Sequence, residues 1–580
     1  MKRTHGAKSA AAAPPPPSGP SWLLPAGVFA AASLVAFLVY DPALSGPFLF
    51  DDRYAMFGRP EAASLPLEAW LPARPFTGLT QYLNYRLSGA STLSYHLFNL
   101  AAHIVTSVLA FLVLWFALRG SEMPGRAQLI AGLGAGVFLL HPLQTEAVAY
   151  ISGRSDVLCA LFAYAALAVF LWYRRPAIGL GAVAAALLLS LLALLSKQQA
   201  VAIPAAFVLI DLLWREDGES PVASLKRNVR LHGLLAVGGV AGAVWVFSEL
   251  ARGNTAGLHI EGVTPLQYFA TQCRAVWHYL RLLVLPLGQS ADPDFPLSPS
   301  LADPAAAGGF IALLALIGAA WYLRKSWPLA AVGILIFLAF LAPTSSFIPI
   351  KDPVAERRVY FPMIGALLVL ADALRRWRVP NATLGAAGAA VLLVLAVLTH
   401  SRAALWGNEL ALWQDTVAAS PNKLRPRFQL AYQYYASGKC QDAVREYAAA
   451  AKLGPPTVEL LVDWGFALEC AGQSEAGLAK AREALAKERT FAAVAQLGMM
   501  LAKRREFAEA LPLLDEAVKL DPNHPSAFAY RGNLHASEGR LAEAEADFRR
   551  ALSLAPGDEM SQRGLNYIQQ RRQGGNPARQ

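Results

Sequence analysis

The sequence predicts an all-α membrane protein in which a domain of about eleven membrane spans precedes a stack of helix pairs. Of the 580 residues, 55% are hydrophobic and 16% are charged, whereas soluble domains carry about a quarter charged residues. The apolar surplus lies almost entirely before residue 400. From residue 424 onward a helical pattern returns about every 34 residues, which indicates a repeat domain.

Composition divides the chain into five segments. The first is basic and rich in Ala and Pro, so it cannot bury a core, and we expect a disordered cytoplasmic tail. A cleavable signal peptide is the alternative, but no small-residue cleavage site follows the first apolar run. The expected segments are 1–21 (tail), 22–400 (membrane domain), 401–423 (connecting half repeat), 424–558 (four repeats) and 559–580 (capping helix and tail).

Eleven apolar windows are long enough to cross a hydrocarbon core, which takes roughly 20 helical residues. They lie at about 22–40, 97–118, 128–142, 157–173, 177–195, 199–214, 232–250, 308–323, 328–345, 361–374 and 381–399.

Lys and Arg beside these windows predict the topology, because short cytoplasmic loops are enriched in them. Six such clusters fall on one side of the membrane if the N-terminus is cytoplasmic. The segment 264–288 is also apolar but carries Arg274, His278 and Arg281, so we expect an amphipathic helix in the outer interface rather than a span. With an odd number of spans, everything after residue 400 lies outside the cytoplasm.

The repeats match the tetratricopeptide pattern, in which small residues let two antiparallel helices approach and proline ends each unit. Ala443, Ala510 and Ala544 occupy the same repeat position, whereas the second unit is degenerate, with Gly477 and Arg489 in place of Ala and Pro. Four such units form a curved surface for a peptide or a protein.

Cys440 and Cys470 lie near helix ends in adjacent repeats. They are able to meet in an oxidising compartment, but spacing alone does not define the geometry of a disulfide. The sequence leaves open whether they pair.

The segment HPLQTEAVAYISGRSD, residues 141–156, sets ionisable side chains between two apolar runs. These side chains are His141, Glu146, Arg154 and Asp156. Ionisable groups at membrane depth or at its edge are costly unless they line an aqueous or substrate-filled cavity. The segment therefore predicts a functional site.

The first outer loop opens with two adjacent carboxylates, Asp51 and Asp52. A carboxylate at an outer membrane face acts as a general base toward a hydroxyl, or holds a cation that screens a leaving phosphate. The alternative is a solvated turn with a side-chain hydrogen bond to the backbone, and composition does not separate the two.

Four basic residues in outer loops oppose the positive-inside rule: Arg154, Lys197, Arg357 and Arg358. A bound anion explains them, because Arg offers a planar fork and Lys a point charge to phosphate oxygens. The alternative is pairing with nearby acids, namely Glu146, Asp156, Asp352 and Glu356. We expect at least two of the four to contact phosphate.

Two further outer segments add candidates. Arg74 lies later in the first outer loop, and Asp292 and Asp294 follow the predicted interfacial helix in a Pro-rich stretch. The two acids either shape an acceptor groove or belong to a turn, and the sequence leaves both interpretations open.

These motifs together resemble one family. FDDR, YHLFNLAAH, HPLQTEAVAYISGRSD, LLSKQQA, PTSSFIPI and AERRVYFP occur in this order, ahead of tetratricopeptide repeats. The arrangement closely resembles the transmembrane and tetratricopeptide-repeat O-mannosyltransferases over about residues 20–570. The resemblance implies the glycosyltransferase C fold for the membrane domain.

The resemblance also implies an enzyme that moves a sugar, mannose or a similar hexose, from a polyprenyl-phosphate carrier to a protein hydroxyl at the outer membrane face. Asp51 or Asp52 matches the acidic motif that such enzymes use for catalysis. No cofactor is specified, and a divalent cation is optional because a lipid phosphate is already a competent leaving group. The family commonly has an acid directly after its Ser-Lys pair, where this chain has Gln198.

The Ala-, Leu- and Pro-rich composition favours a bacterial member, located in the inner membrane with its repeats in the periplasm. A eukaryotic member would instead face the lumen of the endoplasmic reticulum. The expected partners are a lipid-linked sugar donor, a protein acceptor or partner on the repeats, and membrane lipid.

Three other classes of protein fit the sequence less well. The main alternative is a non-catalytic membrane scaffold whose periplasmic repeats assemble protein partners. A transporter is disfavoured because the polar residues gather on the outer side rather than at the midplane. The net charge of +10 does not indicate nucleic-acid binding, because the chain has no basic stripe with interleaved aromatic residues.

Overall fold

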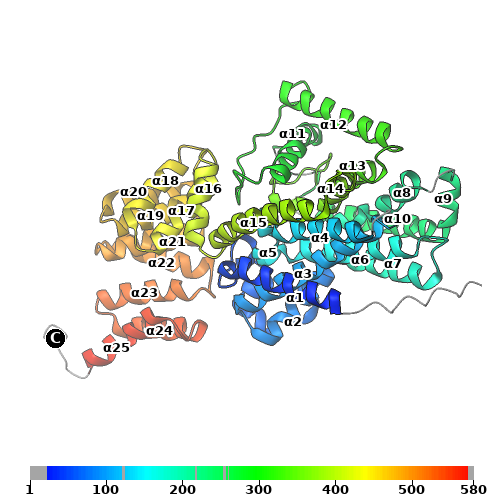
Figure 1. The fold of residues 1–580 in the computed structure, drawn as a ribbon. Helices are drawn as coiled ribbons and strands as arrows, with labels where there is room; N and C mark the ends of the chain where they lie inside the picture. The colour runs from blue at the N-terminus through cyan, green and yellow to red at the C-terminus, as the bar shows by residue number, and fades with distance from the viewer. Residues whose placement is uncertain are drawn as a thin grey trace, which may run out of the picture. The chain divides into compact units, whose positions relative to one another are not determined.

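The computed structural model describes residues 23–119, 124–215, 219–252, 256–258, 260 and 262–572. The predicted disordered tail over 1–21 lies outside these residues. The chain forms two compact units, one from Met1–Leu287 with Pro296–Gly407 and the other from Gly288–Phe295 with Asn408–Gln580. Each unit is helical (Figure 1), and the one β-bridge in the described part of the chain joins Ala256 and Ile350. The predicted all-α class is confirmed.

The first unit contains fifteen α-helices within the described residues. They are α1 (Leu23–Tyr40), α2 (Pro75–Ser88), α3 (Thr92–Ala117), α4 (Pro124–Leu140), α5 (Thr145–Ala149), α6 (Arg154–Tyr173), α7 (Leu180–Ser196), α8 (Ile203–Leu213), α9 (Pro221–Arg227), α10 (Val229–Arg252), α11 (Pro265–Val284), α12 (Pro304–Leu323), α13 (Pro328–Leu341), α14 (Met363–Arg376) and α15 (Asn381–Trp406).

Short 3-10 helices shape the connections of this unit. They are η1 (Asp41–Ala43), η2 (Phe50–Arg53), η3 (Met56–Gly58), η4 (Pro60–Ser64), η5 (Leu67–Trp70), η6 (Pro142–Gln144), η7 (Ile151–Gly153), η8 (Gln198–Ala202) and η9 (Glu356–Val359).

Five helices of the described chain are long and apolar enough to cross a membrane: Thr92–Ala117, Ile151–Tyr173, Val229–Arg252, Pro304–Leu323 and Asn381–Trp406. The helix pair Gly125–Leu140 and Pro142–Ala149 passes the same test together but is bent by 51°. Each of the eleven predicted windows overlaps a helix, although several of these helices are shorter than a full span. The chain is a membrane protein, and the number of eleven spans stays a prediction.

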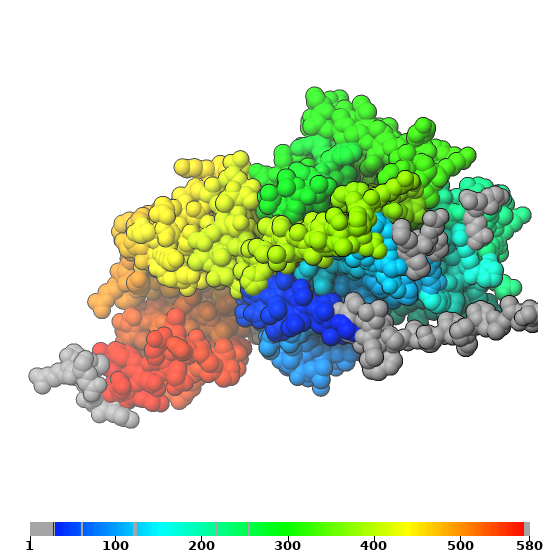
Figure 2. Space-filling model, viewed as in Figure 1, coloured from blue at the N-terminus to red at the C-terminus, as the bar shows by residue number. Residues whose placement is uncertain are grey.

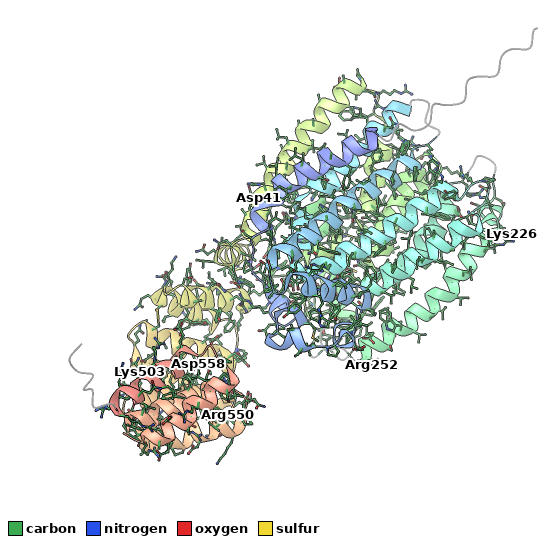
Figure 3. All side chains as sticks on the ribbon, turned by 90° about the horizontal axis from the view of Figure 1, so that it is seen from below. Asp41, Lys226, Arg252, Lys503, Arg550 and Asp558 are labelled. Carbon is green, nitrogen blue, oxygen red and sulfur yellow. A yellow bond between two sulfur atoms is a disulfide. The ribbon has the colours of Figure 1, made fainter. Side chains whose placement is uncertain are left out.

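The long helices run across the first unit. Lys226 lies near the end of the short helix α9, directly before α10, and Arg252 ends α10, so α10 runs between the two labels in Figure 3. Asp41, directly after α1, lies on the side of this unit away from Lys226. The segment predicted as an interfacial helix forms α11, which begins at Thr264 with a capping box completed by Gln267.

The second unit is a stack of helix pairs. Its helices are α16 (Glu409–Ala419), α17 (Leu424–Ala436), α18 (Cys440–Ala450), α19 (Val458–Cys470), α20 (Ser474–Lys487), α21 (Phe491–Lys503), α22 (Phe507–Leu520), α23 (Pro525–Ser537), α24 (Leu541–Leu554) and α25 (Glu559–Arg572). Colour follows residue number from yellow to red along this stack in Figure 2, because consecutive pairs pack in chain order.

The aligned small residues of the repeats lie where two helices touch. Ala443, Ala510 and Ala544 are fully buried. In the degenerate second repeat, a Cβ at Gly477 would lie 3.0 Å from the carbonyl oxygen of Gly465, so glycine suits this close approach. The two helices of the degenerate repeat therefore also pack closely against each other.

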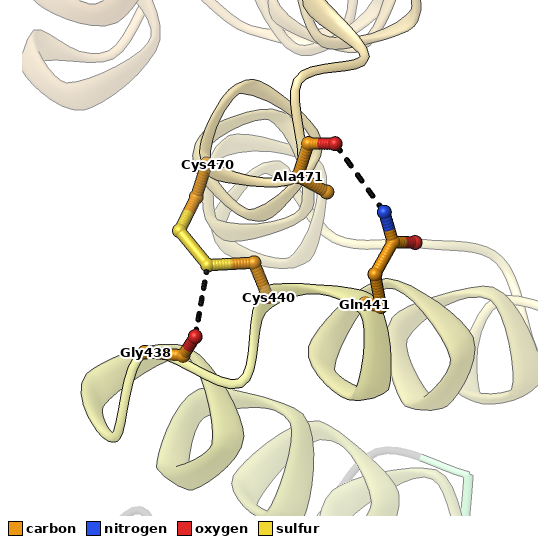
Figure 4. The surroundings of a disulfide bond; sticks show 5 residues. All are labelled: Gly438, Cys440, Gln441, Cys470 and Ala471. Carbon is orange, nitrogen blue, oxygen red and sulfur yellow. Dashed lines mark hydrogen bonds between the residues drawn. A yellow bond between two sulfur atoms is a disulfide. The ribbon is translucent and has the colours of Figure 1, made fainter.

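Cys440 and Cys470 form a disulfide (Figure 4). It joins the first residue of α18 to the last residue of α19, with the two Cα atoms 5.7 Å apart. Beside it, the Gln441 side chain donates a hydrogen bond to the carbonyl of Ala471 at 3.3 Å. The disulfide and this bond tie the first repeat to the second.

Candidate active site

Asp52 lies where two short helices meet, η2 of the first outer loop and η7 after the HPLQTEAV motif. Its Oδ1 accepts hydrogen bonds from the backbone N–H of Ser152 at 2.9 Å and from the Ser152 hydroxyl at 2.5 Å. Its Oδ2 accepts from the backbone N–H of Leu49 at 3.2 Å. Asp52 is only 1% exposed, so its carboxylate acts as a clamp between the two segments.

The turn that presents Ser152 needs a glycine. A Cβ at Gly153 would lie 2.5 Å from the carbonyl oxygen of Ala147, which is closer than real Cβ contacts. Gly153 therefore lets η7 fold back onto α5 and begin α6 directly afterwards.

Burial raises the pKa of Asp52 to about 7, although the hydrogen bonds from Ser152 and Leu49 oppose the shift. The same carboxyl group therefore titrates in the physiological range. Burial also raises the pKa of the neighbouring Tyr150 hydroxyl above its usual range.

Asp51 differs from its neighbour in that its side chain is exposed. Its backbone N–H donates to the Tyr150 hydroxyl at 3.1 Å, whereas its carboxylate has no hydrogen-bond partner among the described residues. Asp51 is close enough to Tyr150 and Arg74 for its charge to act on both. The sequence treats the two acids alike, but the structure makes one a buried clamp and leaves the other available.

Two of the predicted cations are paired with acids. Lys197 forms an ion pair with Asp156, and Arg357 forms one with Glu146, whose Oε2 also accepts from the Arg357 backbone N–H at 2.9 Å. Burial lowers the pKa of Lys197, with Asp156 opposing. Burial disfavours the charged form of Arg357 too, but Glu146 and Asp156 raise its pKa above the usual value. Pairing with neighbouring acids, the alternative considered from the sequence, is thus present at both positions.

Arg74 is the cation of this region without an acidic partner in the described chain. Its guanidinium donates to the Ser155 hydroxyl at 3.1 Å, and it lies within electrostatic range of Asp51, Asp156 and Arg357. Lys197 lies within the same range of Arg74. We call Asp51, Arg74, Asp156, Lys197 and Arg357 the polar cluster.

Backbone contacts hold Arg74 in place at the start of α2. The Gln198 amide donates to the carbonyl of Ala73 at 2.7 Å, and the Thr77 hydroxyl donates to the carbonyl of Ser196 at 3.0 Å. Ala73 has a φ of 63°, an uncommon conformation for a residue other than glycine. The Gln198 amide is therefore a hydrogen-bond donor beside Arg74.

Arg154 and Arg358 lie outside the polar cluster, and their predicted contact with phosphate stays a prediction. Arg154 is fully buried and donates to the side-chain oxygens of Asn84 at 2.8 Å and Asn99 at 3.0 Å. Arg358 is buried and donates to the carbonyls of Pro353 and Asp352. Both side chains brace the surrounding loops through these bonds, although Nη1 of Arg154 has no hydrogen-bond partner among the described residues.

Contacts within the protein also engage three further site candidates, namely His141, Asp292 and Asp294. His141 is buried; its Nδ1 accepts from the backbone N–H of Leu143, and its Nε2 bonds the carbonyl of Leu283. Asp292 belongs to the second unit, where it pairs with Lys423 at 2.5 Å and with Arg425.

Asp294 lies in the same short segment, and its backbone N–H donates to the Ser420 hydroxyl at 3.1 Å. Asp292 and Asp294 thus organise the start of the repeats, and an acceptor groove shaped by them stays a prediction.

Sequence reasoning did not single out Tyr150, Ser152 or Ser155, although all three occur in the polar motif. Their hydroxyl groups contact Asp51, Asp52 and Arg74 respectively. Hydroxyl residues are too common in loops to stand out by type. Their position within a segment already rich in ionisable residues was the available signal.

No three His, Cys, Asp or Glu side chains gather into a metal-binding group within the described residues. Asp52 is engaged with Ser152 and Leu49, so Asp51 and Asp52 do not present a joint pair of free carboxylates. The side chains available for chemistry in this region are those of the polar cluster.

Comparison with known proteins identifies the tetratricopeptide repeats of the chain. A family model described as a tetratricopeptide repeat matches residues 462–525 and 495–559. Among solved structures, the tetratricopeptide protein YrrB is 20% identical and covers 31% of this chain and 89% of its own, with a TM-score of 0.24. The Thermus thermophilus protein TTC0263 is 22% identical, with 30% and 95% coverage and a TM-score of 0.26.

Curated relatives cover both parts of the chain. Protein O-mannosyl-transferase F38B6.6 of Caenorhabditis elegans is 24% identical over 447 residues, which are 73% of this chain and 62% of the relative. Mouse TMTC3 is 24% identical, with 83% and 53% coverage, and human TMTC1 is 26% identical, with 76% and 57% coverage. The chain spans somewhat more than half the length of these relatives. In agreement with its motifs, the chain is a homologue of the tetratricopeptide-repeat protein O-mannosyl-transferases.

Proposed function

We propose that the chain is a membrane glycosyltransferase that moves a sugar, mannose or a similar hexose, from a polyprenyl-phosphate carrier to a Ser or Thr hydroxyl of a protein. The observation that carries this proposal is the available carboxylate of Asp51 beside the cation Arg74. The names of the curated relatives support transfer of mannose to protein. The predominance of polar candidates in the predicted outer loops supports the extracytoplasmic face as the site of transfer.

The reaction proposed is a single inverting displacement. Asp51 removes the proton of the acceptor hydroxyl as its oxygen forms a bond to the anomeric carbon. The bond from that carbon to the phosphate oxygen breaks at the same time, and the polyprenyl phosphate leaves with the electron pair. Arg74 contacts the phosphate, while Lys197 and Arg357 add positive charge nearby.

Asp52 is assigned a positioning role. Its three accepted hydrogen bonds join the loop that carries Asp51 to the segment that carries Tyr150 and Ser152. Tyr150 in turn accepts a hydrogen bond from the Asp51 backbone. The clamp thus sets the direction in which Asp51 faces.

The first test is transfer of radiolabelled sugars from a panel of polyprenyl-phosphate sugars to protein, in membranes carrying the intact chain. Matched membranes carry Asp51→Asn with Asp52→Asn at equal expression. We expect label on protein only with the intact chain, and the donor that gives label identifies the sugar. Equal labelling by both membranes, or no label with any donor while deletion of 405–580 abolishes the cellular phenotype, would support the scaffold alternative instead.

The pKa of Asp52 predicts an acidic limb in the pH profile. Below about pH 7 this carboxyl group becomes protonated, and a protonated oxygen accepts fewer of the three hydrogen bonds that hold the Asp51 loop. We expect kcat/KM for transfer to rise with pH through a midpoint near 7. In Asp52→Asn no group titrates at this position, so this limb should disappear. An unchanged limb in that variant would contradict the assignment.

A further inference from the structure

Asp463 is a half-buried carboxylate on α19 of the second repeat. Within the described residues it has neither a hydrogen bond nor an ion pair. Burial, and to a lesser degree the charge of Glu459 one helical turn earlier, raises its pKa to about 6. Polar groups that are partly withdrawn from water normally have partners, so this unpaired acid is unfavourable in the isolated chain.

Two tyrosines lie within electrostatic range of this acid, and a third lies beside them. Tyr432 and Tyr435 lie on α17 and Tyr447 lies on α18, and the charge of Asp463 acts on both Tyr435 and Tyr447. Tyr432 lies within the same range of the other two tyrosines and is 40% exposed, so this side of the group is open. Tyr447 is fully buried, and its hydroxyl is a second polar group without a hydrogen-bond partner.

The elements that carry these residues are held firmly together. Helices α17, α18 and α19 pack against one another in the first two repeats (Figure 1). The disulfide from Cys440 to Cys470 joins the start of α18 to the end of α19. A site built on α17, α18 and α19 is therefore formed before any ligand arrives, which lowers the entropy cost of binding.

The chemistry of this site selects for a cation. Asp463 lies within electrostatic range of Tyr435, Glu459 lies one helical turn before Asp463 on α19, and no described Lys or Arg lies within ion-pair distance of either acid. Tyrosine rings attract cations through their π-electrons. The same acids repel an anionic ligand.

We propose that the first two tetratricopeptide repeats bind a protein segment through one of its Lys or Arg side chains, with Asp463 as the counter-ion and the rings of Tyr432 and Tyr435 as the walls of the site. The curved surface of helical repeats accommodates an extended chain, so the basic side chain anchors a longer segment. This recognition is separate from sugar transfer and does not rest on the proposed enzyme activity.

The test measures binding of synthetic peptides to the full chain in detergent, by fluorescence anisotropy and without any sugar donor. The probe is a labelled peptide of about nine Ala, Ser and Thr residues with one central Lys, blocked at both ends so that the side chain carries its only charge. The matched neutral peptide has norleucine in place of the central Lys, which keeps the length of the side chain and removes its charge. A second pair compares Arg with citrulline in the same way.

We expect each charged peptide to bind at least about tenfold more tightly than its neutral partner. In Asp463→Asn, a neutral variant of nearly the same shape, this ratio should fall to about one. Tyr432→Phe should keep the preference because the ring is retained, whereas Tyr432→Ala should reduce it severalfold. Glu543→Gln, an acid on α24 of the fourth repeat, is the matched control and should leave the ratio unchanged.

Equal affinity of the charged and neutral peptides for the native chain, or binding of neither, would overturn the proposal. So would an unchanged ratio in Asp463→Asn. Thermal unfolding of the repeats in each variant separates loss of the site from loss of the fold. Since no donor is present, a chain that binds Lys peptides but transfers no sugar would refute the proposed enzyme activity alone.

Discussion

Asp51→Asn is expected to abolish sugar transfer, whereas Asp52→Asn should retain a measurable part of it. A carboxylate that acts as general base in the transition state contributes about 10²–10⁴-fold to the rate. Asp51→Asn should therefore lower kcat by about that factor. Its carboxylate has no hydrogen-bond partner among the described residues, and the fold should therefore survive the change. The measurement is the initial rate of label transfer to protein at saturating donor.

Asp52→Asn should act through the loop instead. The asparagine oxygen still accepts from Ser152, but its amide faces the backbone N–H of Leu49, so one hydrogen bond of about 1 kcal/mol is lost. We expect a fall of about 3–10-fold in kcat. If Asp52→Asn were the more damaging change while both variants unfolded at the native temperature, the base would be Asp52 and the clamp assignment would be wrong.

Arg74→Gln is expected to weaken use of the donor. A charge-assisted hydrogen bond to phosphate contributes roughly 1.5–3 kcal/mol, so kcat/KM for the lipid-linked sugar should fall by about 10–100-fold or more. Arg74→Lys keeps the charge without the planar fork and should recover part of this loss. The check is the dependence of the transfer rate on donor concentration in detergent or vesicles.

Arg86→Gln supplies the matched control, since Arg86 is an exposed cation at the other end of the same helix. It should leave donor use unchanged. Arg154→Gln provides the opposite contrast, because Arg154 is fully buried against Asn84 and Asn99. This variant should lose folded protein rather than donor affinity. Normal donor kinetics in Arg74→Gln would remove Arg74 from the proposed phosphate contact.

The departure at Gln198 suggests how this member holds its site. Its amide donates to the carbonyl next to Arg74, which an ionised carboxylate is unable to do. A neutral donor at this position also leaves the positive charge of Lys197 and Arg74 less compensated. The substitution therefore suits a site that depends on side-chain cations to stabilise the leaving phosphate.

Several features of the molecule were accessible from the sequence because they depend on periodicity and composition. The apolar windows correspond to helices, and the aligned Ala443, Ala510 and Ala544 are buried between helix pairs as the repeat pattern predicts. The similarity to the O-mannosyl-transferases was likewise visible in motifs that occur in a fixed order. The polar motif also located the region of the candidate site, since ionisable residues are rare beside apolar runs.

The different roles within that site depended on the tertiary structure. Asp51 and Asp52 are neighbours of the same type, yet burial against Ser152 separates them, and a sequence does not reveal which of two adjacent side chains faces inward. Arg154 and Arg74 look equally suited to phosphate until the partners of each guanidinium are known.

The sequence by itself thus determined the helical class, the repeats, the similarity to the O-mannosyl-transferases and the residue types available for chemistry. Only the tertiary structure decided which charges are paired. Pairing depends on contacts between segments far apart in the chain, such as Glu146 with Arg357 and Asp156 with Lys197. It likewise left Asp463 without an ion pair among the residues that the structure describes. Burial and distance, rather than residue type, therefore separate the side chains available for ligands from those that hold the fold.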